Sequence, residues 1–256
     1  MASQIIGSVA KALQILNLFT IEKNEWGITE LANALNMQKS TVFRLVDTMA
    51  MQGYLRKTSS EAHYRLGLKI FELGSVVFSN FNLKDVANSY IHSLSEKCGE
   101  TVHMGIINEN SVMSIEKSDS KNSLMSTVLI GKTSPLYCTS VGKVLLAFID
   151  EDKCVRLLKN IKFNKYTEYT ITDCNLLLEE LEKIRDNGYA VDNMEHEFGI
   201  RCIAAPIFDC NNICVASMSI SGPSIRITPD KDEEYARMLM DTCSIISKEL
   251  GYRNAK

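Results

Sequence analysis

The 256-residue sequence lacks several features that would place it in a special class of protein. No apolar run approaches the roughly 20 residues that a membrane span requires. Charged Lys11 interrupts the weak apolar stretch at the N-terminus, so we expect neither a signal peptide nor a membrane partner. Internal repeats and low-complexity tracts are also absent, and there are only 4 prolines. The composition is that of a soluble globular protein, and the length favours two domains.

Cysteine is absent from the first 97 residues, and the 8 cysteines that follow are scattered. This distribution indicates reduced thiols instead of a disulfide framework, which predicts a cytoplasmic protein. Cys210 and Cys214 are close, but three intervening residues do not give the spacing of a zinc knuckle. A nucleophile elbow, an HExxH motif and a glycine-rich phosphate loop are also missing. We therefore expect no bound cofactor.

Charge is unevenly distributed along the chain. The net charge is −3, but residues 1–80 hold eight Lys/Arg against six Asp/Glu, whereas the remainder holds 20 against 25. Within 38–57, four basic residues stand against the single acid Asp47. This asymmetry favours a nucleic-acid surface in the first part of the chain and a different task in the second.

Apolar spacing predicts two helices near the start of the chain. In "VAKALQILNLF", Val9, Leu13 and Leu16 share one helical face. "ITELANALN" is expected to begin a second helix, with Thr29 as its N-cap and Leu31 facing inward.

A third helix and a hairpin follow. The helix is expected from about Lys39 to Met51 and ends near Gly53. Two short strands, over 54–57 and 63–66, flank a polar turn. Helix, helix, tight turn, helix and hairpin is the layout of a winged helix-turn-helix.

The third helix and the hairpin carry the residues that we expect to contact DNA. The first residues of a recognition helix reach base edges, while basic and hydroxyl side chains hold phosphates near its positive end. Each residue alone fits an ordinary solvated surface, but the ordered set of elements favours DNA binding. The expected contacts are Gln38, Lys39, Ser40, Thr41, Phe43 and Arg44 on the helix, and Arg56, Lys57 and Arg65 on the hairpin.

A further apolar stripe recurs at helical spacing between Leu66 and Phe78, through Ile70, Leu73 and Val77. Such a helix fits a domain core or a seam between two chains equally well.

The remainder of the chain predicts an α+β domain. Helices before and after a set of antiparallel strands suggest a sensor-like domain instead of a doubly wound sheet. The expected helices cover 83–99, 141–149, 175–188 and 230–251, and the expected strands cover 101–108, 111–118, 189–195, 200–209 and 213–222.

Hydroxyl groups and backbone amides in this second part are spaced as a small anion would require. In "TSVGK", Thr139, Ser140 and Val141 would open a helix and leave free N–H groups at its positive end. Ser219 and Ser221 alternate by two, so both hydroxyls point from one face of a strand. The alternative for these two serines is an exposed strand face.

Other residues would complete such a pocket. Asp192 and Cys202 lie on neighbouring strands and would close its far side. Leu129, Gly131 and Leu136 would supply apolar wall. The alternatives are that Asp192 caps a turn and that Cys202 is a small buried core residue. Their joint spacing favours a pocket.

Several stretches resemble the IclR family of bacterial transcription regulators. "GSVAKALQILNLF", "ITELANALNMQKSTVFRLVDTMAMQGYL" and "YRLGLKIFELG" are similar to its DNA-binding domain. "GKTSPLYCTSVGKVLLAF", "GYAVDNMEHEFGIRCIAAPIFD" and "ASMSISGPSIRIT" are similar to its effector domain. Three residues depart from the family's pattern: Gln38 stands for a common proline, Tyr137 for histidine and Ser140 for alanine.

The resemblance implies a complete organisation. A winged helix-turn-helix domain would occupy 1–66, a linker helix that helps to pair two chains 67–82, and a GAF-like antiparallel-sheet effector domain 83–256. It implies double-stranded operator DNA and a small organic acid or sugar acid as partners, and a homodimer or a dimer of dimers, with repression as the expected action. In this family, residues that match Asp192, Cys202, Ser219 and Ser221 line the effector site.

Two alternatives remain on the same sequence. One is a metal- or thiol-responsive regulator, because some members of the family are reported to hold a metal. The other is a Cys–His enzyme, although no motif arranges the necessary groups. The residues available to such an enzyme are His103, His196, Asp192 and Cys202.

Overall fold

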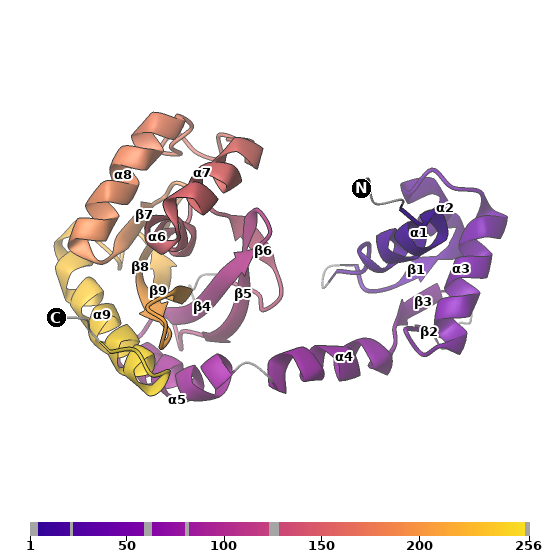
Figure 1. Ribbon diagram of the computed structural model, residues 1–256, viewed down its shortest axis with the longest axis horizontal. Coiled ribbons are helices and arrows are strands. Elements are labelled where there is room, and N and C mark those ends of the chain that lie inside the picture. The colour runs from indigo at the N-terminus through magenta and orange to yellow at the C-terminus, as the bar shows by residue number, and fades with distance from the viewer. Residues whose placement is uncertain (1–4, 21–22, 59–62, 80–81, 123–127, 254–256) are drawn as a thin grey trace. The chain divides into compact units, whose positions relative to one another are not determined.

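The computed structural model describes the chain except residues 1–4, 21–22, 59–62, 80–81, 123–127 and 254–256, and the side chains at 77–79 and 82 (Figure 1). Its contacts divide the chain into two compact units, 1–81 and 82–256. Among the described residues, no helix combines the length and the apolar character that crossing a membrane requires.

The first unit is a winged helix-turn-helix, as predicted. Its core consists of apolar residues from the first three of its four helices and from the sheet, among them Ile15, Leu31, Val42 and Leu55, each at most 1% exposed. The sheet has the order β1-β3-β2, and α4 follows it. The elements are α1 (Gly7–Leu16), β1 (Trp26–Gly27), α2 (Ile28–Ala34), α3 (Lys39–Met51), β2 (Leu55–Lys57), β3 (His63–Leu66) and α4 (Leu68–Ser79).

Local details of this unit correct the sequence predictions. Thr29 is not the N-cap of α2, because the helix begins at Ile28 and Gly27 is its N-cap. The Glu30 carboxylate accepts the Gly27 N–H at 2.9 Å, which satisfies an amide that the helix leaves free. On α1, Val9 and Leu13 are 53% and 54% exposed and do not lie in this unit's core.

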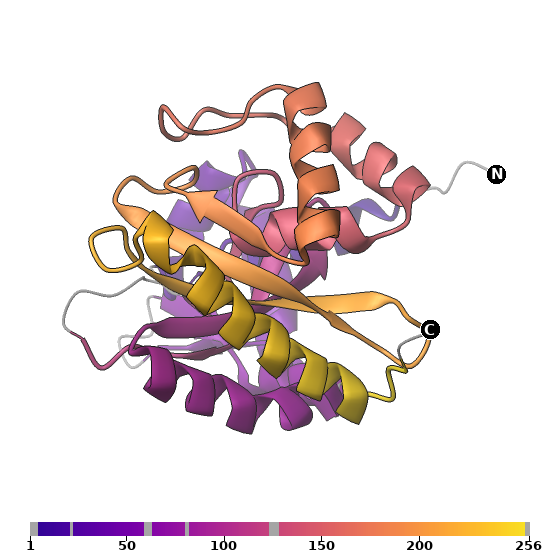
Figure 2. The same ribbon diagram turned by 90° about the vertical axis from the view of Figure 1, so that its left-hand side faces the viewer.

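The second unit is built on a six-stranded sheet of order β6-β5-β4-β9-β8-β7, in which all neighbours are antiparallel. Figure 2 shows α5 and α9 across one face of the sheet, with α6 and α8 on the other side. Each face has its own apolar cluster. The elements are α5 (Asn82–Cys98), β4 (Thr101–Asn108), β5 (Ser111–Ser118), β6 (Thr133–Pro135), α6 (Ser140–Phe148), α7 (Glu151–Asn160), α8 (Cys174–Asn187), β7 (Ala190–Asn193), β8 (Ile200–Phe208), β9 (Cys214–Pro223), a short 3-10 helix (Pro229–Lys231) and α9 (Asp232–Glu249).

The α+β fold class is therefore confirmed, with a helix-turn-helix unit followed by a curled antiparallel sheet. The sequence predicted β4 and β5 to the residue and missed α7. The division into a DNA-binding domain (1–66), a linker helix (67–82) and an effector domain (83–256) stays a prediction.

Candidate DNA-binding surface and ligand pocket

The two sides of α3 differ in chemistry. Val42, Val46 and Met49 are buried in the core of the first unit. The opposite side carries the residues expected to contact DNA, and Gln38 stands at the N-cap. The exposed side chains are Gln38, Lys39, Ser40, Phe43 and Arg44, while Thr41 is half-buried.

The hairpin adds basic side chains. Arg56 and Lys57 on β2 are exposed, whereas Arg65 on β3 is half-buried. Arg56 and Arg65 are register partners in the antiparallel pair. The Arg65 Nε is buried and has no hydrogen-bond partner among the described residues. A buried guanidinium nitrogen without a partner is unfavourable, and a phosphate oxygen is an acceptor that suits it.

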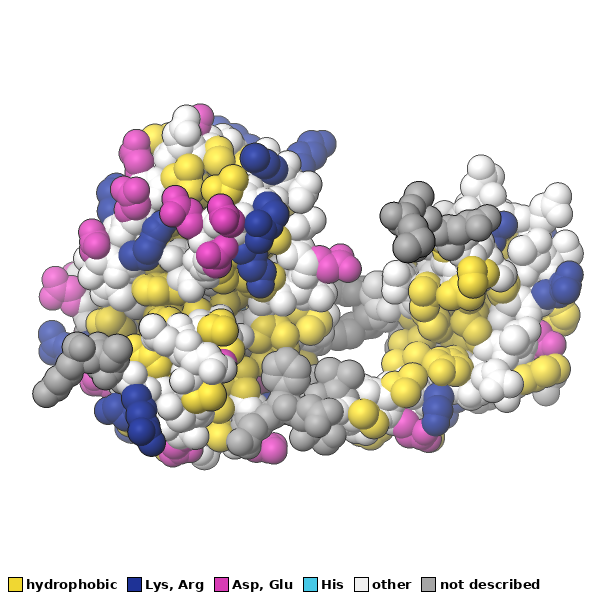
Figure 3. Space-filling model, in the orientation of Figure 1, with side chains coloured by type: hydrophobic (Ala, Val, Ile, Leu, Met, Phe, Trp, Pro, Cys, Tyr) yellow, Lys and Arg dark blue, Asp and Glu magenta, His cyan; other side chains and the backbone are white. Residues whose placement is uncertain are grey.

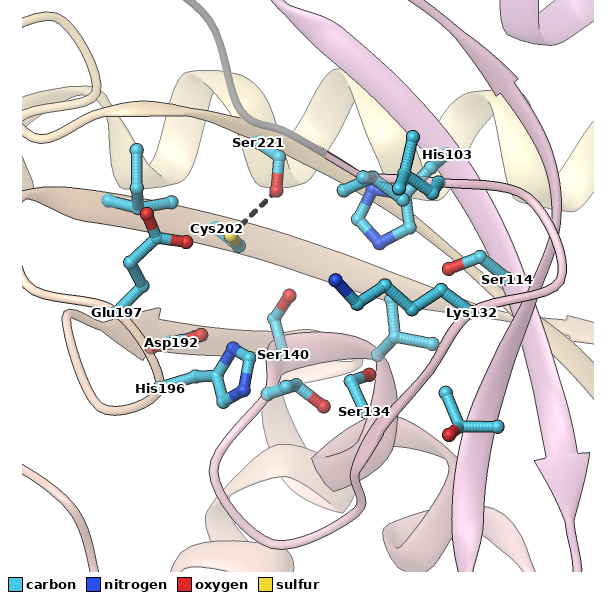
Figure 4. A pocket seen from close by; sticks show the side chains of 16 residues that line it. His103, Ser114, Lys132, Ser134, Ser140, Asp192, His196, Glu197, Cys202 and Ser221 are labelled. Carbon is cyan, nitrogen blue, oxygen red and sulfur yellow. Dashed lines mark hydrogen bonds between the residues drawn. The ribbon is translucent and has the colours of Figure 1, made fainter. Parts of the chain in front are cut away.

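The second unit contains a cavity of about 170 Å³ (Figure 4). This volume suits a small organic molecule and exceeds the space of a single water. Seven of the ten residues that the sequence assigned to a pocket line it: Leu129, Thr139, Ser140, Val141, Asp192, Cys202 and Ser221. The others that line it are His103, Ser114, Val128, Lys132, Thr133, Ser134, His196, Glu197 and Ile200.

The N-terminus of α6 forms one wall of the pocket. Thr139 is its N-cap: the side-chain hydroxyl accepts the Gly142 N–H at 3.2 Å and donates to the Pro135 carbonyl at 2.7 Å. A Cβ at Gly142 would stand 2.2 Å from the Leu136 carbonyl oxygen, so this close approach requires glycine. The amides of Ser140 and Val141 come first in the helix, where N–H groups lack intrahelical acceptors and attract anions.

Asp192, at the end of β7, is 4% exposed and has two tasks. Its Oδ1 accepts the Glu195 N–H at 2.8 Å, so it caps a turn, and its side chain lines the pocket. Burial raises the pKa of this carboxyl to about 7, and the nearby charge of Glu195 adds to the effect. Turn capping and pocket lining, which the sequence offered as alternatives, are therefore combined.

Two polar pairs involve β9: one joins it to β8 and the other joins it to α6. Cys202 Sγ and Ser221 Oγ lie 2.7 Å apart on neighbouring strands (Figure 4). Burial raises the pKa of the Cys202 thiol well above its usual range, so the sulfur stays protonated. Ser219 Oγ lies 3.1 Å from Ser140 Oγ and is fully buried, so an exposed strand face is ruled out for it.

Three residues that the sequence assigned to the pocket do not line it. Leu136 is fully buried in the apolar cluster beside α6. Gly131 adopts a left-handed conformation (φ 81°) and donates its N–H to the Ser114 carbonyl at 2.7 Å. Ser219 stands behind Ser140. Strand alternation gave its face correctly but did not reveal the hydroxyl that covers it.

The pocket is also lined by several polar residues that the sequence analysis did not assign to ligand binding. Figure 4 shows Lys132 reaching into the pocket, with the His196 ring near Asp192. His103 is 8% exposed, and burial, with the charge of Lys117, lowers its pKa to about 4. Its Nδ1 is buried without a partner among the described residues. A strand pattern marks His103 as inward-facing, but no pattern reveals the loop that carries Lys132.

Comparisons with known proteins agree with this architecture. The family described as "Bacterial transcriptional regulator IclR C-terminal" matches residues 75–248, and the "IclR helix-turn-helix domain" matches residues 8–59. The HTH-type transcriptional regulator KdgR of Escherichia coli is 39% identical over 249 residues, which cover 97% of this chain and 94% of that protein. The HTH-type transcriptional repressor AllR of Salmonella typhimurium is 30% identical, with 96% and 90% covered.

Solved structures show the same similarity. The Thermotoga maritima IclR crystal structure has a TM-score of 0.77 and 34% identity, and covers 97% of this chain and 100% of that one. The C-terminal domain of Escherichia coli KdgR has a TM-score of 0.61 and 39% identity, covering 66% of this chain and 99% of that one. The helix-turn-helix unit, the curled antiparallel sheet and the relatives named above together identify a DNA-binding regulator of transcription. The chain belongs to the IclR family.

Proposed function

We propose that this regulator represses transcription as a homodimer whose α3 helices and hairpins bind operator DNA. A small organic acid or sugar acid, bound in the pocket of the second unit, changes its operator affinity. The observation that carries the ligand proposal is the pocket itself, where the N-terminus of α6, Lys132 and several hydroxyls meet a titratable carboxyl. As a bacterial DNA-binding regulator it would act in the cytoplasm.

The homodimer is supported by apolar side chains that the first unit exposes (Figure 3). On and before α1, Ile6 and Leu13 are 67% and 54% exposed, and on α4 Leu68 and Phe71 are 71% and 74% exposed. Apolar surface of this kind marks a protein–protein contact when it is extensive. A second copy of the chain fits such a contact, and two reading helices then meet two half-sites.

A thermal-shift screen against small carboxylates tests the ligand proposal. The panel contains pyruvate, glyoxylate, hydroxy acids and keto-deoxy sugar acids. A ligand at a hundred times its dissociation constant stabilises the folded state by about 2.7 kcal/mol. Asp192→Ala and Ser221→Ala should abolish the melting shift and leave DNA binding intact, while Glu179→Ala on α8 serves as a control. A blank panel together with intact DNA binding would contradict the proposed ligand class.

The metal and thiol alternatives receive little support. Among the described residues, no three His, Cys, Asp or Glu side chains lie together as a metal ion requires. Burial raises the pKa of Cys138, Cys202 and Cys243, which disfavours the reactive thiolate.

The structure does bring His103, His196, Asp192 and Cys202 to one pocket. A Cys–His enzyme needs a thiolate beside its base. Here the thiol is protonated and its partner is the Ser221 hydroxyl, so ligand binding accounts better for the same residues.

A further inference from the structure

A buried ion pair stands behind the pocket, between Lys143 of α6 and Glu195 in the turn after β7. Lys143 is 1% exposed and Glu195 is 5% exposed. The Lys143 ammonium donates to Glu195 Oε1 at 2.5 Å and to the Val191 carbonyl at 2.6 Å. The pair therefore joins two walls of the pocket, because the first turn of α6 forms one and the turn after β7 forms the other.

The turn that Glu195 anchors carries the pocket residues His196 and Glu197, and Asp192, near the end of β7, lies just before it. The backbone of this turn is fixed from the other side as well. Thr170 donates to the Glu195 carbonyl at 2.6 Å, and Thr167 donates to the Met194 carbonyl at 2.7 Å. These contacts set where the Asp192 carboxyl stands in the pocket.

The nearest buried cation, Lys143, pairs with Glu195 and not with Asp192. Two buried acids, Asp192 and Glu195, share the neighbourhood of Lys143, and the close pair is with Glu195. Among the described residues, Asp192 forms no ion pair, and its oxygen accepts a backbone N–H. The other charged or titratable groups near it are His196 and Glu197 of its own turn, Cys138 before α6, Cys202 of β8 and, across the pocket, Lys132. Glu180 of α8 lies 3.6 Å from the Lys143 ammonium.

We propose that Lys143 and Glu195 are positioning residues for the ligand pocket: by pairing with each other, they present Asp192 to the ligand as a carboxyl without a cation of its own. This inference rests on the proposed function, in which the ligand that contacts Asp192 is a small acid. A protonated Asp192 can donate a hydrogen bond to a ligand carboxylate, whereas the ionised form repels it. The ion pair thereby sets the pH range over which the pocket accepts an acid.

The first test needs no ligand. The full-length chain, labelled with ¹³C at the aspartate side-chain carboxyl, is titrated by NMR, and Asp192→Asn identifies the signal. The wild-type midpoint is expected near the pKa of about 7 that burial and Glu195 impose. In Glu195→Gln a like charge is removed and Lys143 loses its carboxylate partner, so the midpoint should fall by about one pH unit or more.

Two further variants separate charge from structure. Adding Lys143→Gln to Glu195→Gln removes the freed cation, so the midpoint should return to the wild-type value or above it. Glu180→Gln removes a more distant charge from the outer side of Lys143 and should leave the midpoint nearly unchanged. Thermal melts confirm that each variant is folded. A wild-type midpoint in the ordinary range of an aspartate, or one that Glu195→Gln does not lower, would overturn the proposal.

The second test measures the affinity of the same variants for pyruvate, glyoxylate and D-gluconate between pH 5.5 and about 8.5. Wild-type affinity should fall up to about tenfold per pH unit above the midpoint, and Glu195→Gln should move this fall to lower pH. An affinity that does not change with pH would contradict the role of Asp192. If no acid binds while the NMR midpoint moves as expected, the ligand class is wrong and the positioning role stands.

Discussion

His103 lines the proposed ligand pocket and carries a buried ring nitrogen, Nδ1, without a partner among the described residues. Its pKa of about 4 keeps the ring neutral at pH 7. A neutral imidazole offers one donor and one acceptor. In the free protein, part of this capacity is unused.

We expect His103→Phe to stabilise the free protein by about 1 kcal/mol, because a buried polar atom without a partner costs about 1–3 kcal/mol. The same change should weaken binding of the acid found in the screen about tenfold, since one hydrogen bond is lost. Thermal melts with and without the acid measure both effects. His92→Phe on α5 is the control, since that exposed ring pairs with Ser118 away from the pocket. A variant that binds the acid as well as wild type would show that His103 has no part in recognition.

Asp192 predicts a pH dependence of stability. Its pKa in the folded state, about 7, is above the ordinary value of 3.8. Between these two values the folded chain holds a proton that the unfolded chain has released, so this group's contribution to stability falls as pH rises through the window and is constant above it. Asp192→Asn keeps an acceptor for the Glu195 N–H but cannot ionise.

The Asp192→Asn variant should therefore be more stable than wild type at pH 8, by at most about 4 kcal/mol at 1.36 kcal/mol per pH unit. The difference should disappear near pH 4. Chemical unfolding at both values measures it. An equal advantage at both pH values would show that the effect comes from packing instead of ionisation.

At the level of elements, apolar spacing and glycine positions predicted those helices and strands whose ends are set by nearby residues. The α3 helix begins at Lys39 and ends at Met51, as expected from its apolar spacing and from Gly53, whose φ of 80° suits glycine. Helix α7 was missed because only Cys154 and Leu158 of its residues are buried. Its signal was the N-cap Asp150, whose carboxylate accepts the Lys153 N–H at 3.0 Å.

The pocket was harder to predict because its residues meet only in the folded chain. Asp192 and Cys202 were predicted from their place on neighbouring strands and from the family resemblance, and the structure makes them register partners. Lys132 was missed because its place depends on a non-local contact, in which its carbonyl accepts the Ser114 N–H at 3.2 Å. Strand periodicity also fails on β5, where the pairing with β4 passes from Glu116 to Ser114 and leaves Ile115 without a register partner.

The exposed side of α3 predicts two different effects on DNA binding. Arg44→Ala should weaken binding to an operator duplex, selected from random DNA by the wild-type protein, by about 1–3 kcal/mol. Lys39→Ala should reduce the slope of log affinity against log salt by about 1, because one phosphate contact is lost. Fluorescence anisotropy at several salt concentrations measures both, with Lys159→Ala, at an exposed lysine of α7 in the second unit, as control. Unchanged binding in both variants would show that α3 does not lie in the DNA groove.

At the level of the whole molecule, the proposed homodimer brings two DNA-reading units together on one operator. A single winged helix-turn-helix contacts one half-site, and pairing two of them raises operator affinity because the second contact becomes intramolecular. The exposed apolar side chains of α1 and α4 are the surface that we assign to this pairing. A ligand can then change operator affinity only if it favours one arrangement of the pair over another.

We therefore expect Phe71→Glu to disrupt the homodimer, since Phe71 is 74% exposed on α4 and a buried, unpaired charge opposes association. Light scattering should give wild type at least twice the 28.7 kDa of one chain and the variant close to that single mass. Operator affinity should fall about a hundredfold, as the avidity of paired half-sites is lost. Leu176→Glu, which places the same charge at an exposed leucine of α8, should leave both the mass and the affinity unchanged. If the Phe71→Glu variant remains dimeric, the interface does not include this part of α4. If the variant is a monomer that keeps full operator affinity, operator recognition does not depend on pairing.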